Sequence, residues 1–163
     1  MRRVTYTIGT STRTADEFLS LLKLHNIELL IDIRRFPTSR FEHFKKENLK
    51  TLLESNGIEY VYLGEKLGGY RRLKYIEYTK TEEFKTALME LENNLTRKNS
   101  VIMCAERFPW RCHRRFVSIE LQKRGWDVLH IIDEKRIWKP AHPVSRPTKK
   151  LFDIERKRDS KIN

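Results

Sequence analysis

The amino-acid sequence predicts a single Rossmann-like α/β domain with a mostly parallel sheet of about five strands and helices on both faces. Its length of 163 residues is typical of one domain. Short apolar stretches typical of strands alternate along residues 4–132 with longer amphipathic stretches typical of helices. Strands that alternate with helices pair in parallel through right-handed crossovers, which leaves both faces of the sheet to be covered by helices.

The first half of the chain contains three strand-like and two helix-like stretches. Residues 4–8 alternate apolar and polar side chains, and residues 29–33 are too short and too uniformly apolar for an amphipathic helix. Between these stretches, residues 14–17 match a capping box, which predicts a helix start. We expect Asn48 to cap the second helix, and a strand over 58–63 to follow it.

The second half begins with an aromatic and basic stretch, residues 70–78, which we expect to lie outside the core. Residues 79–82 match another capping box and precede a long amphipathic stretch that predicts a helix. A strand over 101–104, a loop to about Cys112, a further helix and a strand over 128–132 complete the alternating pattern.

The charge is strongly positive and unevenly distributed. The net charge is +12, and residues 134–163 carry ten Lys/Arg against four Asp/Glu. A positive surface attracts phosphates, nucleotides or nucleic acid. We therefore divide the chain into an α/β domain over residues 1–133 and a basic, Pro-containing tail over 134–163.

The sequence predicts a soluble, cytoplasmic protein. It contains no apolar run long enough for a membrane helix, and the first residues lack the apolar core of a secretory signal. Only two cysteines are present, Cys104 and Cys112, so a disulfide scaffold is excluded. A reducing compartment would keep both as thiols, although a redox switch between them stays open.

Four loops should face one crevice, because ligands of open α/β sheets bind outside the carboxyl ends of the strands. These are residues 9–13, 32–40, 64–70 and 104–114, and they hold most of the unusual polar residues. The densest is the last, which contains both cysteines, a histidine and several arginines just before a predicted helix start. The unpaired N–H groups of a helix start and nearby arginines favour an anion or a thiolate.

The leading hypothesis is an enzyme, or a degenerate one, that binds a phosphate-bearing or nucleotide-like ligand in this crevice. Either cysteine could be the nucleophile, with His113 as base and an acidic side chain to orient it. The candidate catalytic residues are Cys104, Glu106, Cys112, His113 and Asp32. The candidate anion-binding residues are Gly9, Ser11, Arg34, Ser39, Gly68, Gly69 and Arg114.

Simpler explanations exist for two of these groups. Cys104 could be a buried small apolar residue, and Asp32 with Arg34 could form a structural ion pair. A cysteine-phosphatase mechanism is disfavoured, because such a loop needs a cysteine and an arginine separated by five residues and this loop lacks that spacing.

Two alternative functions remain open. The first is a nucleic-acid-binding module with structural cysteines. Its contacts to a single-stranded nucleic acid would come from the basic tail and from Arg71, Arg72, Trp110 and Arg111. The second is a metal-binding domain that uses Cys104, Cys112 and His113, although the close cysteine pair of structural zinc sites is missing.

Four separated motifs between residues 4 and 132 resemble the family called domain of unknown function 488. They are residues 6–9 with Ser11, residues 32–39, residues 67–69, and residues 103–106 with 112–114. The resemblance implies a compact prokaryotic α/β domain without an assigned reaction. The positions that match its motifs are Gly9, Ser11, Asp32, Arg34, Pro37, Ser39, Gly68, Gly69, Cys104, Glu106, Cys112, His113 and Arg114. Thr10 departs from the histidine or tyrosine often found after that glycine.

Overall fold

A computed structural model describes residues 3–140 and shows a six-stranded sheet in the order β3-β2-β4-β1-β5-β6. The strands are β1 (Arg3–Gly9), β2 (Leu29–Asp32), β3 (Glu59–Tyr62), β4 (Ser100–Cys104), β5 (Trp126–Ile131) and β6 (Ile137–Trp138). The first five pair in parallel, and only β6 is antiparallel to its neighbour. The predicted single, mostly parallel α/β sheet is therefore confirmed.

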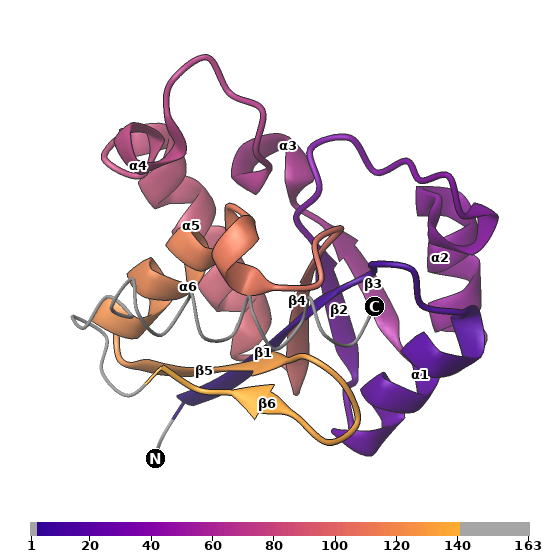
Figure 1. Cartoon of the computed structure of the whole chain (residues 1–163). Helices are drawn as coiled ribbons and strands as arrows, with labels where there is room; N and C mark the ends of the chain where they lie inside the picture. The colour runs from indigo at the N-terminus through magenta and orange to yellow at the C-terminus, as the bar shows by residue number, and fades with distance from the viewer. Residues whose placement is uncertain (1–2, 141–163) are drawn as a thin grey trace, which may run out of the picture.

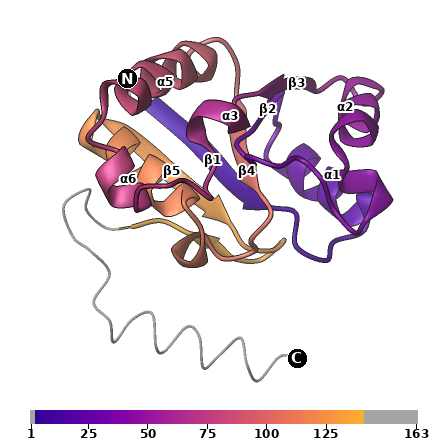
Figure 2. The same cartoon turned by 90° about the horizontal axis from the view of Figure 1, so that it is seen from above.

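Helices cover both faces of the sheet (Figures 1 and 2). The α-helices are α1 (Ala15–Leu24), α2 (Lys46–Glu54), α3 (Gly64–Leu67), α4 (Tyr75–Tyr78), α5 (Glu82–Leu95) and α6 (Arg114–Lys123), with 3-10 turns η1 (Glu42–Phe44) and η2 (Pro109–Arg111). Side chains of α1 and α2 pack into one apolar cluster, and those of α3 to α6 pack into a second. No helix within residues 3–140 is long and apolar enough to cross a membrane.

The neighbouring strands β1 and β4 are followed by connections that lead toward opposite edges of the sheet. From β1 the chain crosses to β2 through α1 on one face, and from β4 it crosses to β5 through α6 on the other. The loops that follow β1 and β4 therefore diverge from adjacent strand ends. Such a switch point is the usual place of a ligand crevice in this fold class.

Backbone fills the gap directly between these two strand ends. The N–H groups of Thr10 and Ser11 donate to the carbonyls of Cys104 and Ala105, each at 2.9 Å. A Cβ added at Gly9 would lie 1.8 Å from the carbonyl oxygen of Glu106, so a side chain cannot fit there. Gly9 thus allows a close approach of two loops and does not line any of the cavities described below.

Two helix starts differ from the sequence predictions and one agrees with them. The second helix begins at Lys46 with Lys45 at its N-cap, because a 3-10 turn leads directly into it, and Asn48 lies inside the helix. The capping oxygen of α5 belongs to Thr81, which accepts from the N–H of Phe84. The N-cap at Thr14 is confirmed, since its oxygen accepts from the N–H of Glu17.

The sheet continues past the expected end of the domain. Strand β6 lies beyond residue 133 and pairs with β5 through His130 and Trp138. Most of the predicted tail, residues 141–163, lies outside the described residues.

Candidate functional site

A cavity of about 820 Å³ opens beyond the carboxyl ends of β2 and β4. Three segments that are far apart in the sequence line it: residues 34–38, residues 69–75 and residues 104–116. The motifs around Arg34 and around the two cysteines therefore lie in one site. Two exposed aromatic side chains, Phe36 and Tyr70, line it as well, with ring centroids 5.9 Å apart.

The two cysteines are in direct contact and line this cavity. Cys104 is the last residue of β4, and Cys112 lies between η2 and α6. The Cys112 thiol donates to the sulfur of Cys104 with an Sγ–Sγ distance of 2.7 Å, and both are free cysteines. The two thiols therefore interact directly, with Cys112 as the donor and Cys104 as the acceptor.

The pKa values of the two thiols move in opposite directions. Burial alone would raise the pKa of Cys104, but the hydrogen bond from Cys112 and the charge of Arg114 outweigh it and lower that pKa to about 7. Burial and the same hydrogen bond raise the pKa of Cys112 well above its ordinary value. Since the two groups titrate together, Cys104 is the thiol of the pair that ionises first, and it does so around neutral pH.

Arg114 is the cation that balances this charge. Its side chain is completely buried, at 0% exposure, and its Nε and one terminal nitrogen have no hydrogen-bond partner. Within residues 3–140 it forms no ion pair with a carboxylate, and its other terminal nitrogen donates to the carbonyl of Arg107 at 3.2 Å. A guanidinium stays charged inside a protein, so a buried one needs a nearby anion. The charge of Arg114 lowers the pKa of Cys104, so this cation favours the thiolate form of Cys104.

The sulfur of Cys112 also occupies the start of α6, where the sequence predicted anion binding. The backbone N–H of Arg114, in the first turn, donates to Cys112 Sγ at 3.4 Å. The next N–H groups donate to the carbonyls of Cys112 and His113. The helix start therefore stabilises a sulfur of this chain and does not face the cavity as a free anion site. Arg114 likewise does not line the cavity.

His113 connects the cysteine loop to the end of β2. Its Nε2 lies 3.1 Å from the carbonyl oxygen of Ile33, and its Nδ1 lies 3.4 Å from Cys112 Sγ. A carbonyl only accepts, so Nε2 carries the hydrogen and Nδ1 is an acceptor that faces the thiol. Burial lowers the pKa of His113 to about 4, which keeps the ring neutral. Gly69 makes room for this ring, because a Cβ there would lie 3.2 Å from Nδ1.

Asp32 and Arg34 form a buried ion pair, and this geometry favours the structural explanation for them. Arg34 donates to both carboxylate oxygens, at 3.0 and 2.8 Å, and also to the carbonyl of Phe44 at 2.7 Å. Tyr60 donates to the same carboxylate at 2.7 Å. Asp32 is completely buried and does not line the cavity, so a role as base toward a ligand has no support in this geometry.

Some of the other predicted site residues pack within the fold, and others line a second, adjoining cavity of about 490 Å³. Glu106 is exposed and lines both cavities, whereas Ser11 and Ser39 line only the second. Gly68 packs against Arg35, where a Cβ would lie 2.4 Å from the arginine side chain. Gly68 is therefore a packing glycine.

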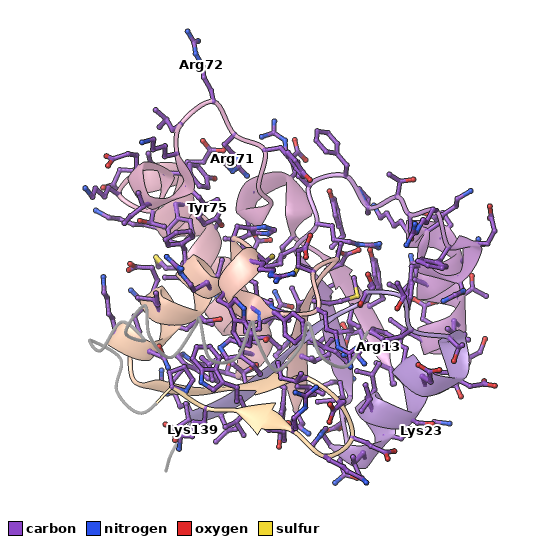
Figure 3. The ribbon with its side chains drawn as sticks, in the orientation of Figure 1. Arg13, Lys23, Arg71, Arg72, Tyr75 and Lys139 are labelled. Carbon is purple, nitrogen blue, oxygen red and sulfur yellow. The ribbon has the colours of Figure 1, made fainter. Side chains whose placement is uncertain are left out.

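The four candidate nucleic-acid contacts have different environments. Arg72 is exposed and points outward from its loop, while Arg71 lies closer to the helices (Figure 3). The Arg71 guanidinium packs 3.9 Å from the ring centroid of Tyr78 and donates to the carbonyls of Gly68 and Glu65. Trp110 is mostly buried and stacks on Phe108, whereas Arg111 is exposed at the cavity.

Sequence reasoning missed Arg35, Phe36 and Thr38 as lining residues. Phe36 carried a usable signal, since an apolar aromatic residue inside a polar loop that follows a buried strand is out of place unless it packs or binds something.

A metal centre has little support from this geometry. Within residues 3–140, no group of three or more His, Cys, Asp or Glu side chains is arranged to hold a metal ion.

Comparison with known proteins identifies one family. The model of the family described as "Domain of unknown function DUF488" matches residues 14–121 of the 163-residue chain. The match includes β2 to β4, most of α6, and every segment that lines the larger cavity. No curated protein matches the sequence.

Proposed function

Because the chain belongs to the DUF488 family, whose description names no function, we propose from the geometry that it is a thiol-dependent enzyme acting on an anionic, phosphate-bearing ligand. The observation that carries the proposal is the contact between Cys104 and Cys112 next to the buried Arg114, which has no carboxylate partner among residues 3–140. A low thiol pKa next to a cation is typical of reactive cysteines and not of structural ones.

The cavity borders these thiols and gives them a positive environment. Cys104 is itself buried, at 1% exposure, so a ligand reaches the pair from the side of the partly buried Cys112. Both cysteines line it, together with Arg35, Arg71 and Arg111, while Glu106 is the single carboxylate residue among the lining residues that the structure describes. Arg34 lines it as well, but Asp32 neutralises its charge. An excess of guanidinium groups raises the local concentration of anions. The proposal therefore places an anionic ligand in this cavity with its reactive centre near Cys104.

The residues around the pair can support nucleophilic chemistry. In the first step, the Cys104 thiolate donates an electron pair to an electrophilic centre of the ligand. The bond from that centre to its leaving group breaks, and the leaving group keeps the bonding pair and takes the proton of the Cys112 thiol. The neutral Nδ1 of His113, 3.4 Å from Cys112 Sγ, is close enough to exchange a proton with this thiol.

Alkylation with a charged and a neutral reagent tests both parts of the proposal. The ratio of the iodoacetate rate to the iodoacetamide rate should be about ten-fold higher for the folded protein than for the chain unfolded in urea, because arginines attract the anionic reagent. High salt should bring the two ratios together. The R35Q/R111Q variant should lower the ratio of the folded protein, whereas R72Q/K74Q, which removes the same charge outside the cavity, should not.

Two results would reject the proposal separately. Folded protein that reacts with neither reagent below pH 8 would exclude an activated thiol. Equal ratios in folded and unfolded protein would exclude an anion-binding cavity while leaving the thiol active.

A single-stranded nucleic acid is a second candidate ligand. Tyr70 is 88% exposed and Phe36 is 60% exposed, and Arg35 and Arg72 lie beside them in the chain. Exposed aromatic rings next to cations stack on bases and bind the backbone. This alternative differs from the first in that the contacts would lie on the outer loops and not at the sulfurs.

A further inference from the structure

A second cavity of about 490 Å³ lies next to the first. Four residues, Thr38, Ala105, Glu106 and Arg111, line both cavities, so the two adjoin along the loop that follows β4. Neither cysteine lines the second cavity. A group bound there would be held close to the thiol site without touching the sulfurs.

The second cavity is lined by more arginine side chains than nearby carboxylates can neutralise. Its arginines are Arg40, Arg107, Arg111 and Arg136, and Glu106 is the single carboxylate among the residues of 3–140 that line it. Arg136 is paired with Asp133 at 2.7 Å. The other three arginines form no ion pair with any carboxylate among residues 3–140. Three guanidinium groups against one carboxylate favour a ligand with more than one negative charge.

Two of these arginines are held in place by aromatic rings, and the third has an unused donor. The guanidinium groups of Arg40 and Arg111 lie 5.0 and 5.7 Å from the ring centroids of Phe41 and Phe108. The Nε of Arg107 is buried without a hydrogen-bond partner. An unpaired buried donor is costly, and the described residues offer this one no acceptor.

Two serines, Ser11 and Ser39, line the second cavity, and the backbone of Ser11 is strained. Ser11 has a φ of 48°, in the left-handed region that residues other than glycine rarely adopt. The bond from its N–H to the carbonyl of Ala105, at 2.9 Å, holds this conformation beside the second cavity. Strain of this kind concentrates at ligand sites. Ser39 belongs to the loop after β2.

We propose that this second cavity is a phosphate subsite, which binds the phosphate group of the ligand through Arg40, Arg107 and Arg111 while the rest of the ligand extends into the first cavity toward Cys104. The inference rests on the proposed function and deepens it. The ligand class is a phosphate monoester or a nucleotide that reacts at a centre other than its phosphate. The phosphate serves for recognition, because the cavity that binds it contains no sulfur.

Calorimetric titration of the full chain with inorganic pyrophosphate tests this subsite. The R40Q/R107Q variant should weaken pyrophosphate binding at least about ten-fold, since it removes two charge-assisted contacts. The matched control R72Q/K74Q removes the same net charge from exposed residues that line neither cavity, and it should change the affinity less than about two-fold. Equal weakening by both variants would mean a diffuse field and would overturn the subsite.

Three controls keep the result interpretable. Thermal unfolding shows whether R40Q/R107Q folds, and if it does not, R40Q alone is used, because Arg40 is exposed. The pH midpoint of iodoacetamide labelling should be the same in R40Q/R107Q and in the unaltered chain, so loss of the subsite and loss of the thiol proposal are distinguishable. A single-stranded oligonucleotide whose binding is weakened by R72Q/K74Q and not by R40Q/R107Q would place phosphate recognition on the outer loop and overturn the subsite.

Discussion

Replacing Asp32 by alanine is expected to lower the free energy of unfolding by about 3–5 kcal/mol, the usual cost of breaking a buried ion pair from one side. The substitution leaves the guanidinium of Arg34 buried without its carboxylate, and it leaves the Tyr60 hydroxyl without its acceptor. Arg34 would keep its bond to the carbonyl of Phe44, but a carbonyl does not neutralise the charge.

Urea unfolding of the variant measures this loss. E82A removes one partner of an exposed pair, Lys85 with Glu82, and should cost less than about 1 kcal/mol. The double variant D32L/R34M replaces both buried charges by apolar groups and should be more stable than D32A. If D32A lost no more stability than E82A, the ion pair would not be structural, and a ligand-directed role of Asp32 would have to be reconsidered.

Replacing Arg114 by methionine is expected to slow alkylation of the cysteine pair at pH 7 by about ten-fold. The guanidinium favours the thiolate of Cys104, so its removal raises the pKa of Cys104. The first pKa unit above 7 lowers the thiolate fraction at pH 7 about five-fold and the second nearly ten-fold, so a ten-fold slowing corresponds to a rise of between one and two units. Stability should change little, because Arg114 is a buried cation without a carboxylate partner among the described residues, and methionine fills a similar apolar space.

The combination of slower alkylation and retained stability distinguishes this role from a packing role. The R72M variant, altered at an exposed position, should match the unaltered chain in both measurements. An R114M protein that unfolds more easily but is alkylated at the normal rate would show that Arg114 only fills space and does not set the thiol pKa.

The alternation of apolar stretches was sufficient to predict the fold, because buried strands and amphipathic helices have different periods. The sequence could not place β6, since two residues carry no period. It also predicted the helix cap at Asn48 wrongly, because the 3-10 turn over Glu42–Phe44 leads straight into the helix and puts Lys45 at the cap.

For the site, the topology rule brought the loop around Arg34 and the loop around Cys104 together correctly. The rule concerns strand ends and not side-chain directions, so it could not tell that Asp32 turns away from the cavity into an ion pair. It also could not tell that Gly9 and Gly68 are needed for packing, since a close approach between loops far apart in sequence has no local pattern. The contact between the two sulfurs depends on the path of residues 105–111, and no local sequence pattern predicts that path.

Titration of the thiolate absorbance in the folded protein tests the coupling between the thiols of Cys104 and Cys112 most directly. The unaltered chain should release its first thiol proton with an apparent pKa of about 7. The C112A variant should shift that step upward, because Cys104 loses its hydrogen-bond donor, and C104S should leave only a thiol that ionises well above neutral pH. If the unaltered chain formed no thiolate until pH 9, Cys104 would not be an activated nucleophile. If C112A titrated like the unaltered chain, Cys112 would not set the pKa of Cys104, and the proposed coupling of the two thiols would be wrong.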